Sequence, residues 1–157
     1  MSETSPTKKI FTLTIPRRFQ PMVQILPDRK LVILITGDRE WDDQEAVDSV
    51  LDAYKDRSVT LIHGDCRGAD KMAGLSALRF PSWTVLSSPA DWKRYGRGAG
   101  PRRNAEMVKQ AVDLESEGMQ CIVLAFYDCL EKSKGTADCV KKALKAGLNV
   151  KYIAHEN

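Results

Sequence analysis

The fold of this chain is decided by residues 31–70, which read LVILITGDREWDDQEAVDSVLDAYKDRSVTLIHGDCRGAD. The uninterrupted apolar run over 31–35 predicts a strand that is covered on both faces, as in a parallel sheet with helices on each side. A second β-rich run over 59–62 ends, like the first, in a polar turn that contains glycine, aspartate and arginine. Because ligands bind at the carboxyl ends of the strands in open parallel sheets, we expect the functional site at this edge.

Strand and helix patterns continue to alternate beyond this stretch. Apolar periodicity indicates helices near 46–54, 68–79, 101–115 and 135–146, and strands near 83–86, 121–126 and 149–153. We expect Pro101 at the first position of its helix, because its fixed φ suits that place. The sequence therefore predicts an α/β fold, with one doubly wound, mainly parallel sheet of about five strands and helices on both faces.

The first 30 residues differ in amino-acid composition from the rest of the chain. Pro6, Pro16, Pro21 and Pro27 follow one another among serine, threonine and basic residues. We expect 1–30 to form a flexible or loosely docked extension, and 31–154 to form a single folded domain, for which this length is sufficient.

Composition limits the classes of function. The 24 Lys and Arg against 21 Asp and Glu give a net charge of +3, which is too small to indicate a nucleic-acid partner. The four cysteines form no CxxC pair and there are only two histidines, so we expect no metal site and no cofactor. No apolar run approaches the roughly 18 residues of a membrane span. We expect a cytoplasmic protein with no membrane partner.

Two glycine-containing turns, at 64–70 and 133–136, each join a strand to a helix. Glycines let a backbone approach a ligand closely, and the free N–H groups at a helix start favour an anion. With Arg39 and the Arg-Arg-Asn run at 102–104, they predict a site for a phosphate or a sugar; the alternative is that both are ordinary turns. The commoner nucleotide fingerprints are absent from the sequence, since GxGxxG fails at Pro101 and no GxxxxGK[ST] occurs.

Each acidic candidate near these turns has a structural alternative. Asp70 either contributes a carboxylate to the site or caps the helix that begins there. Asp65 either contacts a ligand or satisfies backbone N–H groups of its own turn. Asp91 and Trp92 either bind a ribose hydroxyl and stack a base, or Trp92 packs on the sheet edge.

The basic and remaining polar candidates are open in the same way. Arg39 and Arg67 either hold a phosphate or form surface ion pairs. His63 is either a packed group at the end of a strand or a general base. Thr136 lies at a helix start, where it has a capping role to which a phosphate contact would be added.

Five motifs occur in unbroken order, at 36–39 (TGDR), 63–70 (HGDCRGAD), 90–92 (ADW), 98–107 (GAGPRRNAEM) and 133–138 (SKGTAD). This series resembles the YspA, or cpYpsA-related, branch of the SLOG superfamily, and the resemblance extends over about 31–153. It implies a Rossmann-like fold with a pocket for a nucleotide or nucleoside-derived ligand. The superfamily includes the LOG phosphoribohydrolases, the DprA DNA-processing proteins and ligand-sensing domains.

The LOG enzymes cleave the N-glycosidic bond of a nucleoside monophosphate. Such a reaction needs a group that holds the phosphate and a carboxylate beside the ribosyl cation that develops in the transition state. Their helix motif, Arg-Lys followed by a methionine, is similar to 103–107 in this chain. The resemblance implies that Arg103 takes the arginine role and that Asn104 replaces the lysine.

The second LOG motif places a glutamate three residues after a Gly-Thr pair. Residues 135–136 match that pair, but Cys139 stands at the glutamate position and Asp138 lies one residue earlier, about 100° around the helix. The predicted catalytic residues are Arg103, Asp138 and Asp70. The predicted ligand-binding residues are Gly37, Arg39, Gly64, Asp65, Arg67, Gly68, Asp91, Trp92, Asn104, Ser133, Gly135 and Thr136.

Three functions remain open at this point. The first is binding of a nucleotide-derived small molecule with LOG-like hydrolysis of its N-glycosidic bond, and the second is a non-catalytic sensor or adaptor for such a ligand. The third is DprA-like binding of single-stranded DNA. The cations available for that third role are Lys93, Arg94, Arg97, Arg102 and Arg103. By analogy with the LOG relatives, we also expect a homodimer.

Overall fold

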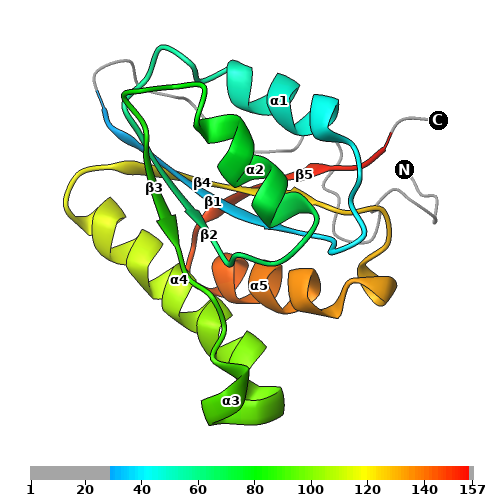
Figure 1. Cartoon of the computed structure of the whole chain (residues 1–157). Helices are drawn as coiled ribbons and strands as arrows, with labels where there is room; N and C mark the ends of the chain where they lie inside the picture. Colours follow the sequence, from blue (N-terminus) through cyan, green and yellow to red (C-terminus); the bar gives the residue numbers. More distant parts are fainter. Residues whose placement is uncertain (1–28, 156–157) are drawn as a thin grey trace, which may run out of the picture.

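The computed structural model describes residues 29–155 and shows a five-stranded sheet between two layers of helices (Figure 1). The strands are β1 (Leu31–Gly37), β2 (Val59–His63), β3 (Thr84–Ser87), β4 (Gln120–Phe126) and β5 (Asn149–Ile153). They lie in the order β3-β2-β1-β4-β5, and every neighbouring pair is parallel. The predicted fold class is confirmed. The predicted extension over 1–30 lies outside the described residues, apart from its last two.

Side chains of β1 alternate between two cores, which is why the whole strand is apolar. Leu31, Ile33 and Ile35 pack with α1 (Gln44–Asp52) and α2 (Ala69–Ala77). Val32 and Leu34 pack with α4 (Ala99–Ser116) and α5 (Lys134–Lys145) on the opposite face. All five side chains are fully buried. Parallel strands that are covered on both faces in this way give the continuous apolar run seen in the sequence.

The basic, glycine-rich stretch over 93–100 is largely helical. The helix α3 (Trp92–Tyr95) begins where the side chain of Asp91 accepts a hydrogen bond from the N–H of Arg94, and a 3-10 turn over Gly96–Gly98 comes next. Since α4 then begins at Ala99, Pro101 lies within its first turn, and the prediction of Pro101 at the first position was wrong. A proline is tolerated there because N–H groups of the first turn have no intrahelical acceptor.

The strand order places a crevice at the carboxyl ends of β1 and β4. The chain runs from β1 through β2 to β3 at one edge and then crosses to β4 on the other side of β1. The helices after β1 and β4 cover opposite faces of the sheet (Figure 1), so the loops that leave these two strands diverge. Ligands bind at such a point in open α/β sheets. Within 29–155, no helix has the length and apolar character needed to cross a membrane.

Candidate functional site

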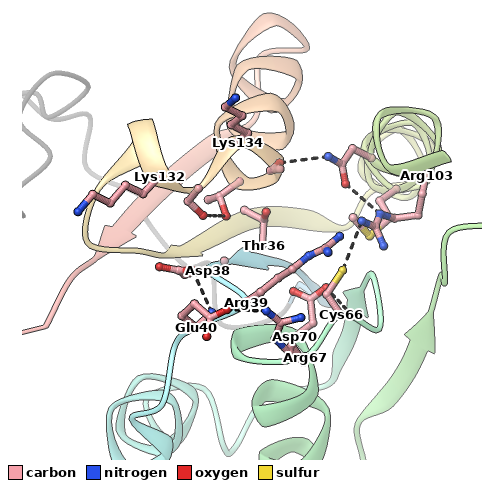
Figure 2. A pocket seen from close by; sticks show the side chains of 16 residues that line it. Thr36, Asp38, Arg39, Glu40, Cys66, Arg67, Asp70, Arg103, Lys132 and Lys134 are labelled. Carbon is pink, nitrogen blue, oxygen red and sulfur yellow. Dashed lines mark hydrogen bonds and ion pairs between the residues drawn. The ribbon is translucent and has the colours of Figure 1, made fainter. Parts of the chain in front are cut away.

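A cavity of about 250 Å³ opens at the carboxyl ends of β1 and β4. Its walls come from the loop after β1, the turn between β2 and α2, the first turns of α4 and the start of α5. Figure 2 shows Lys132 and Lys134 on one side of it, with Arg39, Arg67 and Asp70 on the other. The residues predicted from sequence that line it are Gly37, Arg39, Arg67, Asp70, Arg103, Asn104, Ser133, Gly135 and Thr136.

Arg103 forms a fixed positive charge at the base of the site. The residue is only 6% exposed, and its Nη1 donates to the carbonyl of Gly64 at 2.5 Å. Its Nε donates to Asn104 Oδ1 at 3.0 Å, and its Nη2 lies 3.5 Å from Cys66 Sγ. These bonds tie α4 to the turn after β2. They leave further guanidinium N–H groups, because an arginine carries five of them.

Asp70 is a buried carboxylate beside this arginine. Its Oδ2 accepts hydrogen bonds from the N–H groups of Gly64 at 2.9 Å and Cys66 at 3.3 Å. The N-cap of α2 is Gly68, so the carboxylate holds the turn after β2 and does not cap the helix. Burial raises the pKa of Asp70 from 3.8 to about 6, although the two N–H groups and Arg103 act in the opposite direction. No described residue donates to Oδ1, and Asp70 lines the cavity.

The start of α5 lines the cavity with residues 133–136. Ser133 is the N-cap, but its side chain makes no capping bond and instead lies 2.8 Å from Thr136 Oγ1. The first N–H groups of a helix have no intrahelical acceptor and favour an anion. A Cβ added at Gly135 would meet nothing within 4 Å, so the space beside this helix start is open.

The other glycines of the predicted site serve a different purpose. A Cβ at Gly37 would lie 2.4 Å from Ala69 Cβ, and one at Gly64 would lie 2.5 Å from Arg103 Nη1. Gly68 has φ +82°, and its Cβ would lie 2.4 Å from the carbonyl oxygen of Asp38. Three of the four glycines thus allow the protein to pack against itself, and Gly135 alone among them is open.

A second cavity of about 230 Å³ adjoins the first. It is lined by Pro89, Ala90 and Trp92 on one side, and by Gly64 and Asp65 on another. The indole of Trp92 is half exposed, and the guanidinium of Arg39 lies 5.7 Å from its ring centre. A half-exposed aromatic face beside an arginine can stack a planar ring.

Several predicted residues have structural partners. The carboxylate of Asp91 caps α3 and lines neither cavity. Asp65 (φ 58°) lies 2.8 Å from Lys71 Nζ, and this hydrogen bond lowers the pKa of Asp65. Arg67 forms a surface ion pair with Glu40, which was one of the two roles left open for it. His63 is a packed group: its Nδ1 accepts the N–H of Asp65 at 3.0 Å, and burial lowers the pKa of this imidazole.

The two candidate carboxylates of the LOG comparison occupy different places. Asp138 lines neither cavity; its Oδ2 accepts from Asn104 Nδ2 at 3.0 Å and from Lys142 Nζ at 2.6 Å. Cys139, at the glutamate position, is fully buried, and burial raises the pKa of its thiol to about 11. Of the predicted catalytic residues, the structure brings Arg103 and Asp70 together in the cavity, whereas Asp138 supports Asn104 from outside it.

The sequence-based prediction missed five residues of the first cavity that carry a charge or a thiol: Asp38, Glu40, Cys66, Lys132 and Lys134. The two lysines flank Ser133 directly, so their closeness to a predicted phosphate site was a usable signal. Cys66 lies within the motif at 63–70, but no chemistry was assigned to it, and it reaches the site through its place in the turn. Among the described residues, no group of three or more His, Cys, Asp or Glu side chains is arranged to hold a metal ion.

This chain is similar to known proteins in sequence and in fold. The sequence profile of the YspA, cpYpsA-related SLOG family matches residues 31–95, which run from β1 to the end of α3. The Gene 61 protein of Mycobacterium phage D29 is 37% identical over 125 residues, which cover 75% of this chain and 92% of the phage protein. The X-ray structure of DNA processing protein A (DprA) from Streptococcus pneumoniae is similar in fold, with a TM-score of 0.56 and 16% sequence identity. That similarity covers 81% of this chain and 51% of DprA, so the chain spans about half the length of that protein.

Proposed function

The chain belongs to the YspA, cpYpsA-related SLOG family, and from this premise we propose that it binds a nucleotide or nucleoside-derived ligand at the carboxyl edge of its sheet. The phosphate lies at the start of α5, where it accepts hydrogen bonds from the N–H groups of residues 134–136 and faces the guanidinium of Arg103. The family and a fold shared with a DNA processing protein support a role related to nucleotides or DNA.

The observation that carries this proposal is the composition of the first cavity. Five cations line it, namely Arg39, Arg67, Arg103, Lys132 and Lys134, against the three carboxylates of Asp38, Glu40 and Asp70. One of the five, Arg103, is buried and fixed, so it binds an anion without losing side-chain freedom. Helix N–H groups and a preorganised guanidinium are the usual means of phosphate recognition.

Binding is tested by calorimetry with a panel of nucleoside monophosphates and two matched variants. Gly135→Ala places a methyl group in the open space beside the helix start, so we expect at least a tenfold loss of affinity. Gly98→Ala is the control. A Cβ at Gly98 also meets nothing within 4 Å, but Gly98 lines neither cavity. Equal affinities of the two variants, or no binding of any monophosphate by the unaltered chain at millimolar concentration, would reject the proposal.

Hydrolysis of the N-glycosidic bond is supported by the position of Asp70. A carboxylate with a free oxygen beside a phosphate site is what stabilises a ribosyl cation. With a pKa of about 6, Asp70 is mostly ionised at pH 7.5. We expect free base and ribose phosphate to appear on incubation with the preferred monophosphate, and Asp70→Asn to abolish their formation. Nucleotide recovered intact by chromatography after long incubation, from a protein that binds it, supports the sensor function instead.

Binding of single-stranded DNA is favoured by one feature, the surface of α3 and the start of α4. Arg94 and Arg102 lie over the ring of Tyr95 at 5.1 and 4.2 Å, beside the half-exposed Trp92. Aromatic and cationic side chains of this kind bind single strands with a strong dependence on salt. A gel shift at low salt that is lost in an Arg94→Ala/Arg102→Ala variant supports this function, and no shift at low salt rejects it.

A further inference from the structure

The two cavities of the site share one wall. Arg39, Cys66, Arg67 and Arg103 line both the first and the second cavity. A molecule that lies across this wall contacts α5 at one end and Trp92 at the other. We call Arg39, Arg67 and Arg103 the arginine wall.

The two sides of the arginine wall offer different chemistry. The first cavity has helix N–H groups and the free Oδ1 of Asp70, which belongs to a residue only 5% exposed. The second cavity has Pro89, Ala90 and the indole of Trp92. A polar, anionic part of a ligand therefore fits the first cavity, and a planar ring fits the second.

The three arginines of the arginine wall carry more positive charge than a single phosphate group neutralises. Arg103 faces the phosphate site directly, while Arg39 and Arg67 are exposed side chains that can turn toward a second anionic group. Arg67 is paired with Glu40, but both side chains are mostly exposed, at 65% and 74%, and such pairs are weak. The pair can therefore be exchanged for a stronger contact with a ligand phosphate.

The free oxygen of Asp70 selects the chemical group that lies beyond the outer phosphate. An ionised carboxylate repels a terminal phosphate dianion, whereas it accepts hydrogen bonds from hydroxyl groups. When the outer phosphate is esterified to a sugar, the sugar supplies such hydroxyl groups. The esterified phosphate also carries less negative charge than a terminal phosphate dianion.

We propose that the ligand is a nucleoside diphosphate sugar that spans both cavities. Its base stacks on Trp92 in the second cavity, its two linked phosphates lie along the arginine wall and the start of α5, and its outer sugar donates to Asp70 Oδ1. This inference rests on the proposed function and deepens it, because it names two phosphates and two sugars where the function requires only one of each.

The test measures binding of AMP, ADP, ADP-ribose, UDP-glucose and inorganic pyrophosphate by calorimetry. We expect at least one of the two diphosphate sugars to bind at least tenfold more tightly than AMP or ADP. Trp92→Ala should weaken that binding at least tenfold and leave pyrophosphate affinity unchanged, while Trp92→Phe should restore most of it. Arg39→Ala should weaken diphosphate sugars more than AMP.

Two exposed substitutions serve as controls. Leu78→Ala removes an exposed apolar side chain and Lys141→Ala removes an exposed charge, and neither residue lines a cavity. Affinities for AMP, ADP and both diphosphate sugars within threefold of one another would overturn this inference and leave the proposed function intact. Absence of binding for every compound, pyrophosphate included, would overturn both. Tighter binding of AMP than of the diphosphate sugars would also overturn this inference and leave the proposed function intact.

Discussion

At the scale of single residues, Asp70 is the most informative position in the chain. Its pKa is raised from 3.8 to about 6 by burial, so folding favours its protonated form between these values. Stability from this group is fully present below about pH 4 and is lost as pH rises through about 6. At about 1.36 kcal/mol for each pKa unit, the loss amounts to about 3 kcal/mol.

We predict that Asp70→Asn removes this part of the pH dependence. The amide keeps an oxygen for the N–H groups of Gly64 and Cys66 but has no charge to desolvate. The unfolding free energy of the variant minus that of the unaltered chain should therefore be larger at pH 7 than at pH 4. Chemical denaturation at pH 4, 5, 6 and 7 measures the difference, and parallel stability curves for the two proteins would contradict the prediction.

Gly64 should be required for the position of Arg103, not for the ligand directly. A methyl group at Gly64 would lie 2.5 Å from Arg103 Nη1 and 2.8 Å from its Cζ, so Gly64→Ala must displace the guanidinium. We expect a loss of about 1–3 kcal/mol in unfolding free energy, as for other overpacked sites, together with at least a tenfold loss of anion affinity. Sulfate is a suitable probe because its charge does not change between pH 4 and 8. Unchanged sulfate affinity in a folded Gly64→Ala protein would show that Arg103 does not hold the anion.

At the scale of elements, one side chain links α4 to α5. Asn104 is 4% exposed; its Oδ1 accepts from Arg103 Nε, and its Nδ2 donates to the carbonyl of Gly135 at 3.2 Å and to Asp138 Oδ2 at 3.0 Å. The amide thus sets the orientation of the arginine and the distance between the two helices that form the phosphate site.

Removing this link should affect stability and binding together. Asn104→Ala removes the partner of the buried Arg103 Nε–H and two part-buried bonds, to the Gly135 carbonyl and to Asp138 Oδ2. We therefore expect a loss of about 1–3 kcal/mol in unfolding free energy and weaker sulfate binding. Lys109→Ala on the same helix breaks only the exposed pair with Asp113 and should cost less than about 1 kcal/mol. Denaturation curves for both variants make the comparison. Equal effects would mean that Asn104 does not join the two helices.

At the scale of the whole molecule, stability should be highest along the central strands. β1 pairs with β4 over its full length and with β2 on its other side, and the side chains of both β1 and β4 are almost entirely buried. β3 is a short edge strand whose side chains are exposed or half-buried. Hydrogen exchange becomes slower as opening requires more of the structure to unfold.

We therefore predict that amides of 31–36 and 121–126 exchange most slowly, and that those of 84–87 exchange early. Native-state hydrogen exchange, read out by mass spectrometry on peptides, measures both sets. The element that carries the second cavity, α3, should open easily, since none of its four residues is buried. Protection of β3 as strong as that of β1 would contradict this order.

Local patterns in the sequence were sufficient to predict the fold and the edge of the sheet at which the cavity lies. Continuous apolar runs at 31–35 and 121–126 identify strands covered on both faces, and glycine-containing turns mark the strand ends. These signals are local, because the side-chain period of a strand and the φ freedom of a glycine depend only on nearby residues. Thr136 and Arg103 both line the first cavity, and the sequence assigned both to one site because ligands bind at the carboxyl edge of a parallel sheet.

Which side chains reach the cavity depends on contacts between distant parts of the chain. Asp138 lies two residues after Thr136, about 200° around the helix, so it faces α4 while Thr136 faces the cavity. Asp70 is the buried carboxylate of the cavity because its partners lie in the preceding turn and because α4 places Arg103 beside it, 33 residues further along the chain. Arg103 in turn bonds to Gly64, 39 residues away in sequence. Such long-range contacts have no local pattern, since packing between elements, not the properties of any one of them, determines which distant groups meet.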